Sequence, residues 1–133
     1  MDATEREGVR GRVLVGLLLL GMITPVAFGW RFSVVASGSM RPGVRPGDLV
    51  VTVPADELRP GDVIRFHDRN RPRRALLHRI ARVRADGLLI TKGDANAVVD
   101  RAPIPRSAVS GVLRLRIPYA GLPVLWLLTR TAR

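Results

Sequence analysis

The chain contains one long apolar run near its start and a series of short apolar runs after it. No charged residue occurs over the 18 positions 13–30, and an arginine stands on each side of this run. A run of this length is just long enough to span a bilayer. A cleavable signal peptide is the alternative, because small residues lie two apart at Ala27 and Gly29, after the apolar core. The pattern leaves both interpretations open.

The charges around this run do not orient it. Residues 2–12 are charged and lack apolar periodicity, so we expect a flexible leader over 1–12. Three arginines come shortly before the run and three shortly after it, namely Arg6, Arg10 and Arg12, then Arg31, Arg41 and Arg45. The positive-inside bias therefore has little to act on.

From residue 31 the pattern changes to short runs with alternation or β-branched residues, which predicts strands. These runs cover 32–36, 48–53, 62–66, 75–83, 87–92 and 108–117. Turn sequences separate them, including two copies of RPGD, at 45–48 and 59–62, and ADG at 85–87. No further helix is predicted. We therefore expect a mostly β, antiparallel domain over 31–116, after one N-terminal transmembrane helix at 13–30.

Two segments fall outside this alternation. Residues 67–74, HDRNRPRR, are polar and basic, which predicts a loop. The segment 117–133 is apolar for most of its length but too short to span a bilayer, and its Tyr119 and Trp126 suit a membrane interface. The alternative is that this segment belongs to the core of the β domain.

Composition narrows the classes of function. The formal net charge is +11 and the pI about 11.8, which suggests nucleic acid or anionic lipid as a neighbour. The arginines are spread over every segment and aromatic residues make up only 5%, so we favour a general arginine bias and expect no nucleic-acid partner. The absence of cysteine excludes disulfides, thiol chemistry and Cys-ligated metal centres, and we expect no metal and no cofactor.

The stretch VVASGSMRPGVRPGDLVV, residues 34–51, places two serines between two predicted strands. A serine hydroxyl becomes an effective nucleophile only when a base takes its proton and donors stabilise the oxyanion. Gly38 permits a sharp turn between Ser37 and Ser39, and Pro42 ends the extended run soon after. By itself, such a triplet is more typical of an ordinary loop.

Few residues could serve as the base. The chain has two histidines, His67 in a polar stretch and His78 within an apolar strand, and one lysine, Lys92. A histidine at such a strand position is usually a packed core residue. Two carboxylates, Asp94 and Asp100, follow the strand at 87–92, and either could orient an imidazole.

Taken in order, these segments resemble the type I signal peptidases, in the branch typical of the endoplasmic reticulum, archaea and some Gram-positive bacteria. The serine stretch is similar to that family's serine box. The HRI sequence is similar to the box that carries the general base, which is lysine in the ordinary bacterial enzymes and histidine in this branch. The resembling segments are SGSMRPGVRPGDLV (37–50), GDVIRF (61–66), HRI (78–80), TKGDANAVVD (91–100) and IPYAG (117–121).

The resemblance implies a serine endopeptidase, a signal peptidase I with a Ser-His-Asp triad. Ser39 matches the nucleophile, His78 the general base and Asp100 the third member of the triad. Asp94 matches an important supporting residue. Ser37 matches the residue whose hydroxyl helps the Ser39 backbone N–H to bind the oxyanion.

The resemblance also implies a substrate site and a location. Val35, Ala36 and Met40 would help to line shallow pockets for small side chains, as in the Ala-x-Ala preference. The implied partners are preprotein signal peptides, membrane lipid, and a secretion translocon or accessory subunits. The β domain would lie on the extracytoplasmic side of a membrane, behind an uncleaved single-pass anchor. Arg41 and the arginine-rich stretch 69–74 depart from the family's pattern and bear on substrate preference.

Three alternatives stay open. A self-cleaving repressor-like or conjugation-type peptidase would share the β core and the Ser-Met pair, but it uses a lysine base, for which only Lys92 is present. A basic, membrane-tethered binding module would need neither Ser39 nor His78. A specialised peptidase for a few precursors, such as pilin or matrix proteins, would carry the same motifs.

Overall fold

The computed structural model of the protein describes residues 3–68 and 71–130. The chain divides into two units between Trp30 and Arg31. The first unit is a helix, and the second contains the sheet.

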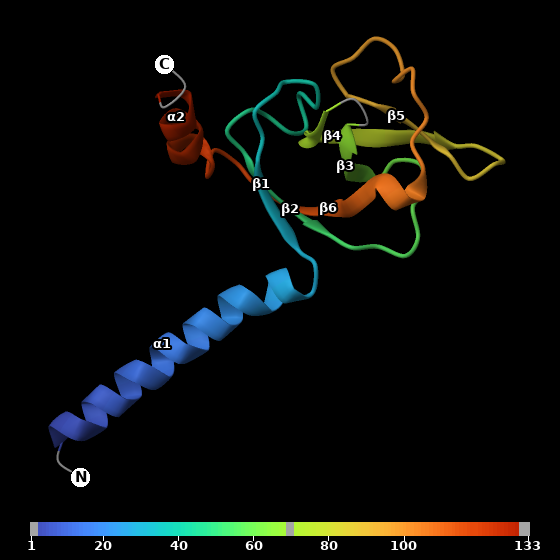
Figure 1. The fold of residues 1–133 in the computed structure, drawn as a ribbon. Helices are drawn as coiled ribbons and strands as arrows, with labels where there is room; N and C mark the ends of the chain where they lie inside the picture. Colours follow the sequence, from blue (N-terminus) through green and yellow to red (C-terminus); the bar gives the residue numbers. More distant parts are fainter. Residues whose placement is uncertain (1–2, 69–70, 131–133) are drawn as a thin grey trace. The chain divides into compact units, whose positions relative to one another are not determined.

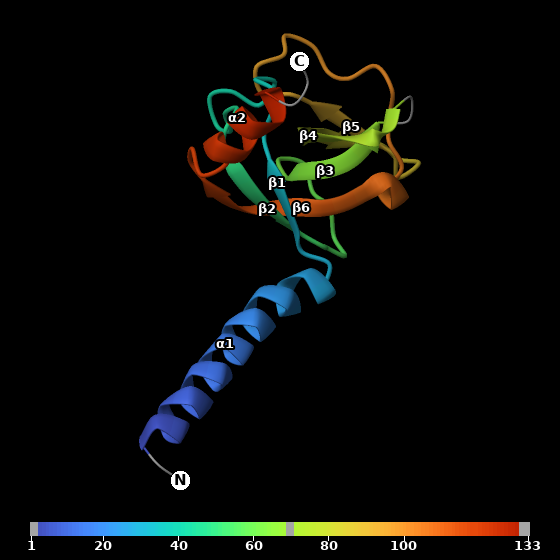
Figure 2. The same cartoon turned by 60° about the vertical axis from the view of Figure 1, so that its left-hand side comes forward.

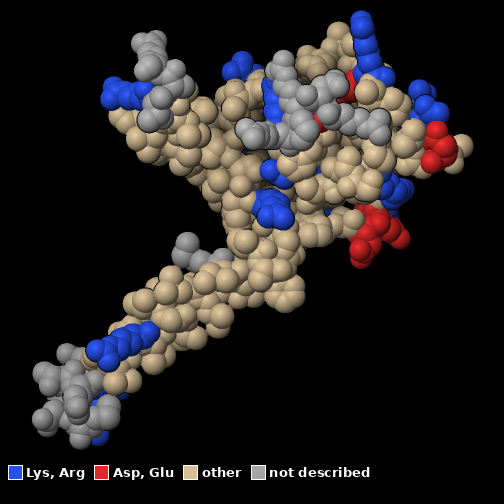
Figure 3. Space-filling view, viewed as in Figure 1, with Lys and Arg blue, Asp and Glu red and all other residues tan. Residues whose placement is uncertain are grey.

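The helix of the first unit, α1, covers Ala3–Ala27. Its segment Gly8–Ala27 has 20 residues and a mean hydropathy of 1.6, and is long and apolar enough to cross a membrane by length and composition. The charged side chains visible on this helix lie toward its N-terminal end (Figure 3). Residues 3–12, expected to form a flexible leader, are helical instead, because most of them are residue types that a helix accommodates.

The second unit is built on one six-stranded antiparallel sheet (Figure 1). Its strands are β1 Arg31–Val34, β2 Leu49–Val53, β3 Val63–Asp68, β4 Arg71–Val83, β5 Leu89–Lys92 and β6 Val109–Ile117. Their order is β1-β2-β6-β3-β4-β5, so β6 lies between β2 and β3 (Figure 2). A short 3-10 turn, Arg106–Ala108, leads into β6. The prediction of a mostly antiparallel β fold, with one N-terminal helix long enough to span a membrane, is confirmed.

The basic stretch 67–74, predicted as a loop, is largely strand. β3 continues to Asp68 and β4 begins at Arg71, and the two strands form a hairpin whose residues 69–70 lie outside the described part of the chain. His67, Arg74 and Ala75 are exposed. This end of the hairpin therefore carries no apolar alternation from which strands could be predicted.

A second helix, α2 at Leu122–Arg130, corrects the expectation that no helix occurs outside the anchor. Its leucines favour a helix, and Pro123 is tolerated in the first turn. None of the α2 residues is buried, so this segment does not close the core of the β domain. Gly121, just before α2, packs so closely on β1 that a Cβ there would lie 2.5 Å from a methyl carbon of Val34.

Apolar side chains pack in two clusters on this sheet. The larger cluster contains Leu58, Ile64, Phe66, Ile80, Leu89, Ile104 and Val112. The smaller cluster contains Met40, Val44, Val50 and Val63. Because successive residues of a strand point to opposite faces, Val63 and Ile64 place the two clusters on opposite faces of β3. The strand at the centre of the domain is therefore buried on both sides.

The two RPGD sequences form the same turn. The glycine has a positive φ in each, +88° at Gly47 and +96° at Gly61, as a type II turn after proline requires. In each turn the aspartate, Asp48 or Asp62, accepts a 2.8 Å hydrogen bond from the backbone N–H of the arginine three residues before it. The repeat is reused turn chemistry, as predicted.

Asp48 differs from Asp62 because its side chain is fully buried. Its carboxylate accepts hydrogen bonds from the backbone N–H groups of Arg45 (2.8 Å) and Tyr119 (3.1 Å) and from the guanidinium of Arg116. Burial opposes ionisation, but these donors outweigh it and lower the pKa of Asp48 below its ordinary value of 3.8. Asp48 thus joins the turn before β2 to the end of β6 and to the approach to α2.

We expect Asp48→Ala to lower the free energy of unfolding by about 3 kcal/mol, because it leaves the Arg116 charge and two N–H donors without their acceptor. Asp62→Ala, in the matching and more exposed turn, is the control and should cost less than about 1 kcal/mol. Thermal unfolding of the full-length protein in detergent, followed by circular dichroism, measures both. Equal losses in the two variants would contradict the role given to Asp48.

The stability difference between the wild type and Asp48→Ala should depend on pH. Because the folded pKa of Asp48 lies below that of an unfolded aspartate, its stabilisation is present above about pH 4 and is lost as the pH falls through the folded pKa. The gap in unfolding temperature between the wild type and Asp48→Ala should therefore narrow in acid.

Candidate active site

The serine stretch is a loop between β1 and β2 whose two ends meet at one point. Val35 donates its N–H to the carbonyl of Asp48 (2.9 Å), and its own carbonyl accepts the N–H of the glycine before that aspartate (2.8 Å). Within the loop, the hydroxyl oxygens of Ser37 and Ser39 lie 3.3 Å apart. Ser37 is exposed and Ser39 is half-buried. The structure therefore places the predicted nucleophile and the predicted oxyanion donor side by side.

Met40, expected to line a substrate pocket, lies in the core instead. It is 1% exposed and packs with the smaller apolar cluster around Val50 and Val63. Its carbonyl accepts the N–H of Val44 at 2.9 Å, which closes a turn directly after the serine. The side chain next to Ser39 therefore anchors the loop from below rather than forming a cavity wall.

His78 lies on β4, opposite Ile64 of β3, and is only 8% exposed. Its Nδ1 lies 2.6 Å from Oδ2 of Asp100. Phe66 meets the imidazole edge-on, with ring centroids 6.1 Å apart and an angle of 71° between the rings. The structure thus brings together the predicted base and the later of the two predicted carboxylates.

Thr91 also binds the carboxylate partner of His78. Its hydroxyl, buried in β5, donates to the same Oδ2 of Asp100 at 2.6 Å. A carboxylate can only accept hydrogen bonds when it is ionised, so the Nδ1 of His78 is the donor in this pair. Nε2 is then the ring nitrogen with a free lone pair, as a general base requires.

The segment that carries Asp100 also contacts the serine. Ala95 donates its N–H to the carbonyl of Ser39 at 2.8 Å. Gly93 permits this approach, because a Cβ there would lie 2.7 Å from the Ser39 carbonyl oxygen. In the described part of the chain, no hydrogen bond joins the Ser39 hydroxyl to His78 directly. The segment 93–100 is therefore the link between the serine backbone and the carboxylate partner of the histidine.

Asp94, the earlier carboxylate, pairs with Arg79 rather than with the histidine. The Nε and Nη2 groups of Arg79 donate to its two oxygens at 2.9 and 2.7 Å. Nη1 of Arg79 donates to the carbonyl of Gly61 at 2.7 Å. The bidentate bond lowers the pKa of Asp94, although burial opposes this. Asp94 thus braces the start of the 93–100 segment against the turn before β3.

Strand alternation separates Lys92 from the histidine. Thr91 pairs with Ile80, and Lys92 pairs with Arg79. Because successive side chains of a strand point to opposite faces, Thr91 and His78 share one face, and Lys92 lies on the other. This placement separates Lys92 from the pair formed by His78 and Asp100.

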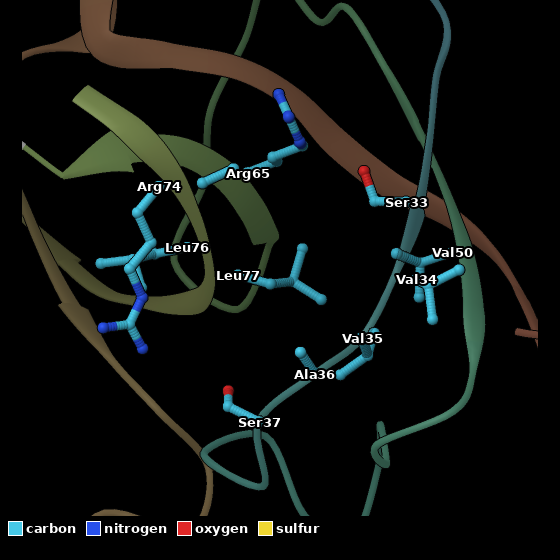
Figure 4. A pocket seen from close by; sticks show the side chains of 11 residues that line it. Ser33, Val34, Val35, Ala36, Ser37, Val50, Arg65, Arg74, Leu76 and Leu77 are labelled. Carbon is cyan, nitrogen blue, oxygen red and sulfur yellow. The ribbon is translucent and has the colours of Figure 1, made fainter. Parts of the chain in front are cut away.

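A cavity of about 230 Å³ opens beside Ser37, between the chain that follows β1 and the strands β3 and β4 (Figure 4). It is lined by residues 33–37, Val50, Arg65 and residues 74–77. Val35 and Ala36 are therefore in its wall, next to the apolar side chain of Leu77. The end near the serine loop suits small apolar side chains.

The sequence did not predict the roles of Thr91 and Arg79. Thr91 lies in a predicted strand and Arg79 directly follows the predicted base, but neither was assigned a contact in the site. Their partners depend on the register between β4 and β5 and on the path of the 93–100 segment. His67, expected to lie on the surface, is exposed near the end of β3.

Comparison with known proteins finds similarity to a signal peptidase. No model of a known protein family matches the chain. Signal peptidase I W of Bacillus subtilis is 40% identical to it over 87 residues. The similar region covers 60% of this chain and 44% of that relative, so the chain spans less than half of the relative's length. The similarity supports a relationship to type I signal peptidases at the level of the family.

Proposed function

We propose that the protein is a membrane-anchored serine endopeptidase that cleaves signal peptides from translocated preproteins, with Ser39 as nucleophile and His78 as general base. The observation that carries this proposal is the 2.6 Å hydrogen bond between His78 Nδ1 and Asp100, which leaves Nε2 to act as the base. The similarity to signal peptidase I W supports the class of reaction.

In the proposed reaction, Ser39 Oγ attacks the scissile carbonyl carbon while His78 Nε2 accepts the hydroxyl proton. The Asp100 carboxylate stabilises the imidazolium that forms. Collapse of the tetrahedral intermediate breaks the C–N bond, and His78 delivers the proton to the leaving amine. Water, deprotonated by His78, then hydrolyses the acyl-enzyme and regenerates Ser39.

The oxyanion of the tetrahedral intermediate needs hydrogen-bond donors at a fixed position. We assign this role to the Ser39 backbone N–H and the Ser37 hydroxyl. The support is the 3.3 Å separation of the hydroxyl oxygens of Ser37 and Ser39.

Two unpaired backbone edges offer a place for the substrate. In the described part of the chain, β1 pairs only with β2, and β4 pairs with β5 only from Arg79 onward. The cavity with Val35, Ala36 and Leu77 in its wall lies between these two strands. An extended peptide could add here as a further strand, with small side chains in the cavity and its scissile carbonyl at Ser39.

The proposed location is a membrane, with α1 as a single-pass anchor and the β domain on the extracytoplasmic side. The length and composition of α1 support the anchor. The nine residues of α2 are too few to span a bilayer, and the exposed Trp126, Leu127 and Leu128 suit the membrane interface. Signal peptides and lipid are the proposed partners, with a translocon or accessory subunits as further candidates.

We expect Ser39→Ala and His78→Ala each to lower cleavage of a preprotein by about 10³-fold or more, because each removes a group that acts in every turnover. Both variants should still accumulate in the membrane. His67→Ala is the matched control and should cleave like the wild type. Gel analysis of preprotein processing in detergent or liposomes measures this. Activity lost in His67→Ala and kept in His78→Ala would assign the role of general base to His67 instead of His78.

Replacement of Asp100 should mainly reduce the cleavage rate, whereas replacement of Asp94 should mainly reduce stability. Asp100→Asn should reduce the cleavage rate by about 10⁴-fold, the scale of loss for a triad carboxylate made neutral, with little change in unfolding temperature. Asp94→Asn weakens the bidentate bond to Arg79, so it should lower the unfolding temperature and reduce activity less. Rates and unfolding curves of the same preparations separate the two. Full activity in Asp100→Asn with none in Asp94→Asn would give the orienting role to Asp94.

A histidine base predicts a particular pH profile. Because an imidazole is in general a weaker base than a lysine amine, kcat/KM of an enzyme with a histidine base should level off at a lower pH than that of an enzyme with a lysine base. His78→Lys should restore little activity, because Asp100 would favour the charged ammonium. Both profiles can be measured on a synthetic Ala-x-Ala peptide. A wild-type profile that still climbs between about pH 8 and about pH 10, or an active lysine variant, would make Lys92 a candidate again.

A further inference from the structure

The cavity beside the serine loop has a basic end. Ser37 lies at one end, while Arg65 and Ser33 lie at the other (Figure 4). Arg74 lines the β4 wall of the same cavity, and in this view its guanidinium points away from that of Arg65, toward the end where Ser37 lies. The apolar side chains between these ends include Val35 and Leu77.

Arg65 is held in place but is not neutralised. Its Nη1 donates to the hydroxyl of Ser110 at 2.9 Å, and that hydroxyl donates to the Arg65 carbonyl at 3.1 Å. Its Nε is buried and has no hydrogen-bond partner. Among the residues that the structure describes, no carboxylate lies within ion-pair distance of Arg65 or Arg74. Burial and the nearby charge of Arg31 both lower the pKa of Arg65.

A partly desolvated cation without a counter-ion is unfavourable, and an anionic ligand group would offset this. The cavity volume limits what such a ligand can be. At about 230 Å³ the cavity is smaller than the roughly 300–1,000 Å³ typical of small-molecule sites, so it has room for a few side chains rather than for a cofactor. The apolar wall beside Arg65 suits a peptide better than a fully polar anion.

We propose that Arg65 forms a subsite for an acidic side chain of the bound peptide, with Arg74 adding a second positive charge to the wall of the same cavity. The cavity then selects substrates that combine small residues at the cleavage site with an Asp or Glu a short distance away. This inference rests on the proposed function, because it takes the peptide to lie along residues 33–37 with its scissile carbonyl at Ser39. Since extended chains advance at the same rise per residue, the carboxylate should lie about three to six residues from the cleaved bond.

Peptides that share an Ala-x-Ala sequence and carry either Glu or Gln at one scanned position test this proposal with the full-length protein in detergent. At one or two neighbouring positions, we expect Glu to raise kcat/KM by about 5- to 20-fold over Gln, and added salt should reduce this preference. Arg65→Gln should bring the Glu/Gln ratio to about 1, and Arg74→Gln should lower it in part. Arg82→Gln, an exposed arginine further along β4, is the matched control and should keep the ratio.

Arg74 is exposed, so its variant tests the subsite even where Arg65→Gln fails to fold. A ratio near 1 at every position in the wild type, or a preference kept in both cavity variants, would overturn the proposal.

Binding to Ser39→Ala protein separates this inference from the proposed function. Fluorescence anisotropy of labelled Glu and Gln peptides should show tighter binding of the Glu peptide, lost in Arg65→Gln, even where no cleavage is found. Cleavage of neutral peptides without any Glu preference would keep the proposed function and remove the subsite. Displacement of the labelled Glu peptide by phosphatidylglycerol vesicles, but not by unlabelled Glu peptide, would assign the arginines to lipid and overturn the proposal.

Discussion

The position of the serine loop depends on one buried carboxylate, that of Asp48. The backbone of this residue closes the loop through Val35, and its side chain accepts hydrogen bonds from Arg45, Arg116 and Tyr119. The turn before β2, the end of β6 and the approach to α2 therefore meet at this carboxylate, and the chain after β1 bonds the backbone of the same residue. A buried charge of this kind is tolerated only when its donors are complete, so these elements are held together or released together.

A second set of contacts, made by the segment 93–100, connects the residues of the candidate site. The segment 93–100 contacts the backbone of Ser39 at one end and supplies the carboxylate beside His78 at the other. Arg79 holds the start of the same segment through Asp94. Ser39 lies in the loop after β1 and His78 lies on β4, and one short segment contacts both the Ser39 backbone and the imidazole of His78. Preorganisation of this kind is what nucleophilic catalysis requires of a protein.

Hydrophobic alternation was sufficient to predict the antiparallel sheet, because most strands bury one face against an apolar cluster. It failed where burial is missing, at the exposed end of the β3–β4 hairpin and in α2. The site residues were named from motifs, and the structure adds what motifs lack. Met40 is buried because the loop folds back over the core, and Thr91 meets Asp100 because of strand register. Contacts between distant segments cannot be read from local patterns.

The β-bulge between β4 and β5 has a consequence for how such a site could change. Two residues of β4, Ala81 and Arg82, occupy the space that one residue would fill opposite Ile90, which sets the phase of the strand on the side of His78. A shift by one residue would turn every side chain to the other face. The single lysine of the chain, Lys92, lies on β5 beside β4, but its side chain points to the face opposite that of His78. Lys92 could therefore reach the face of His78 only through a change of register between β4 and β5, whereas a substitution at position 78 places another side chain on that face directly.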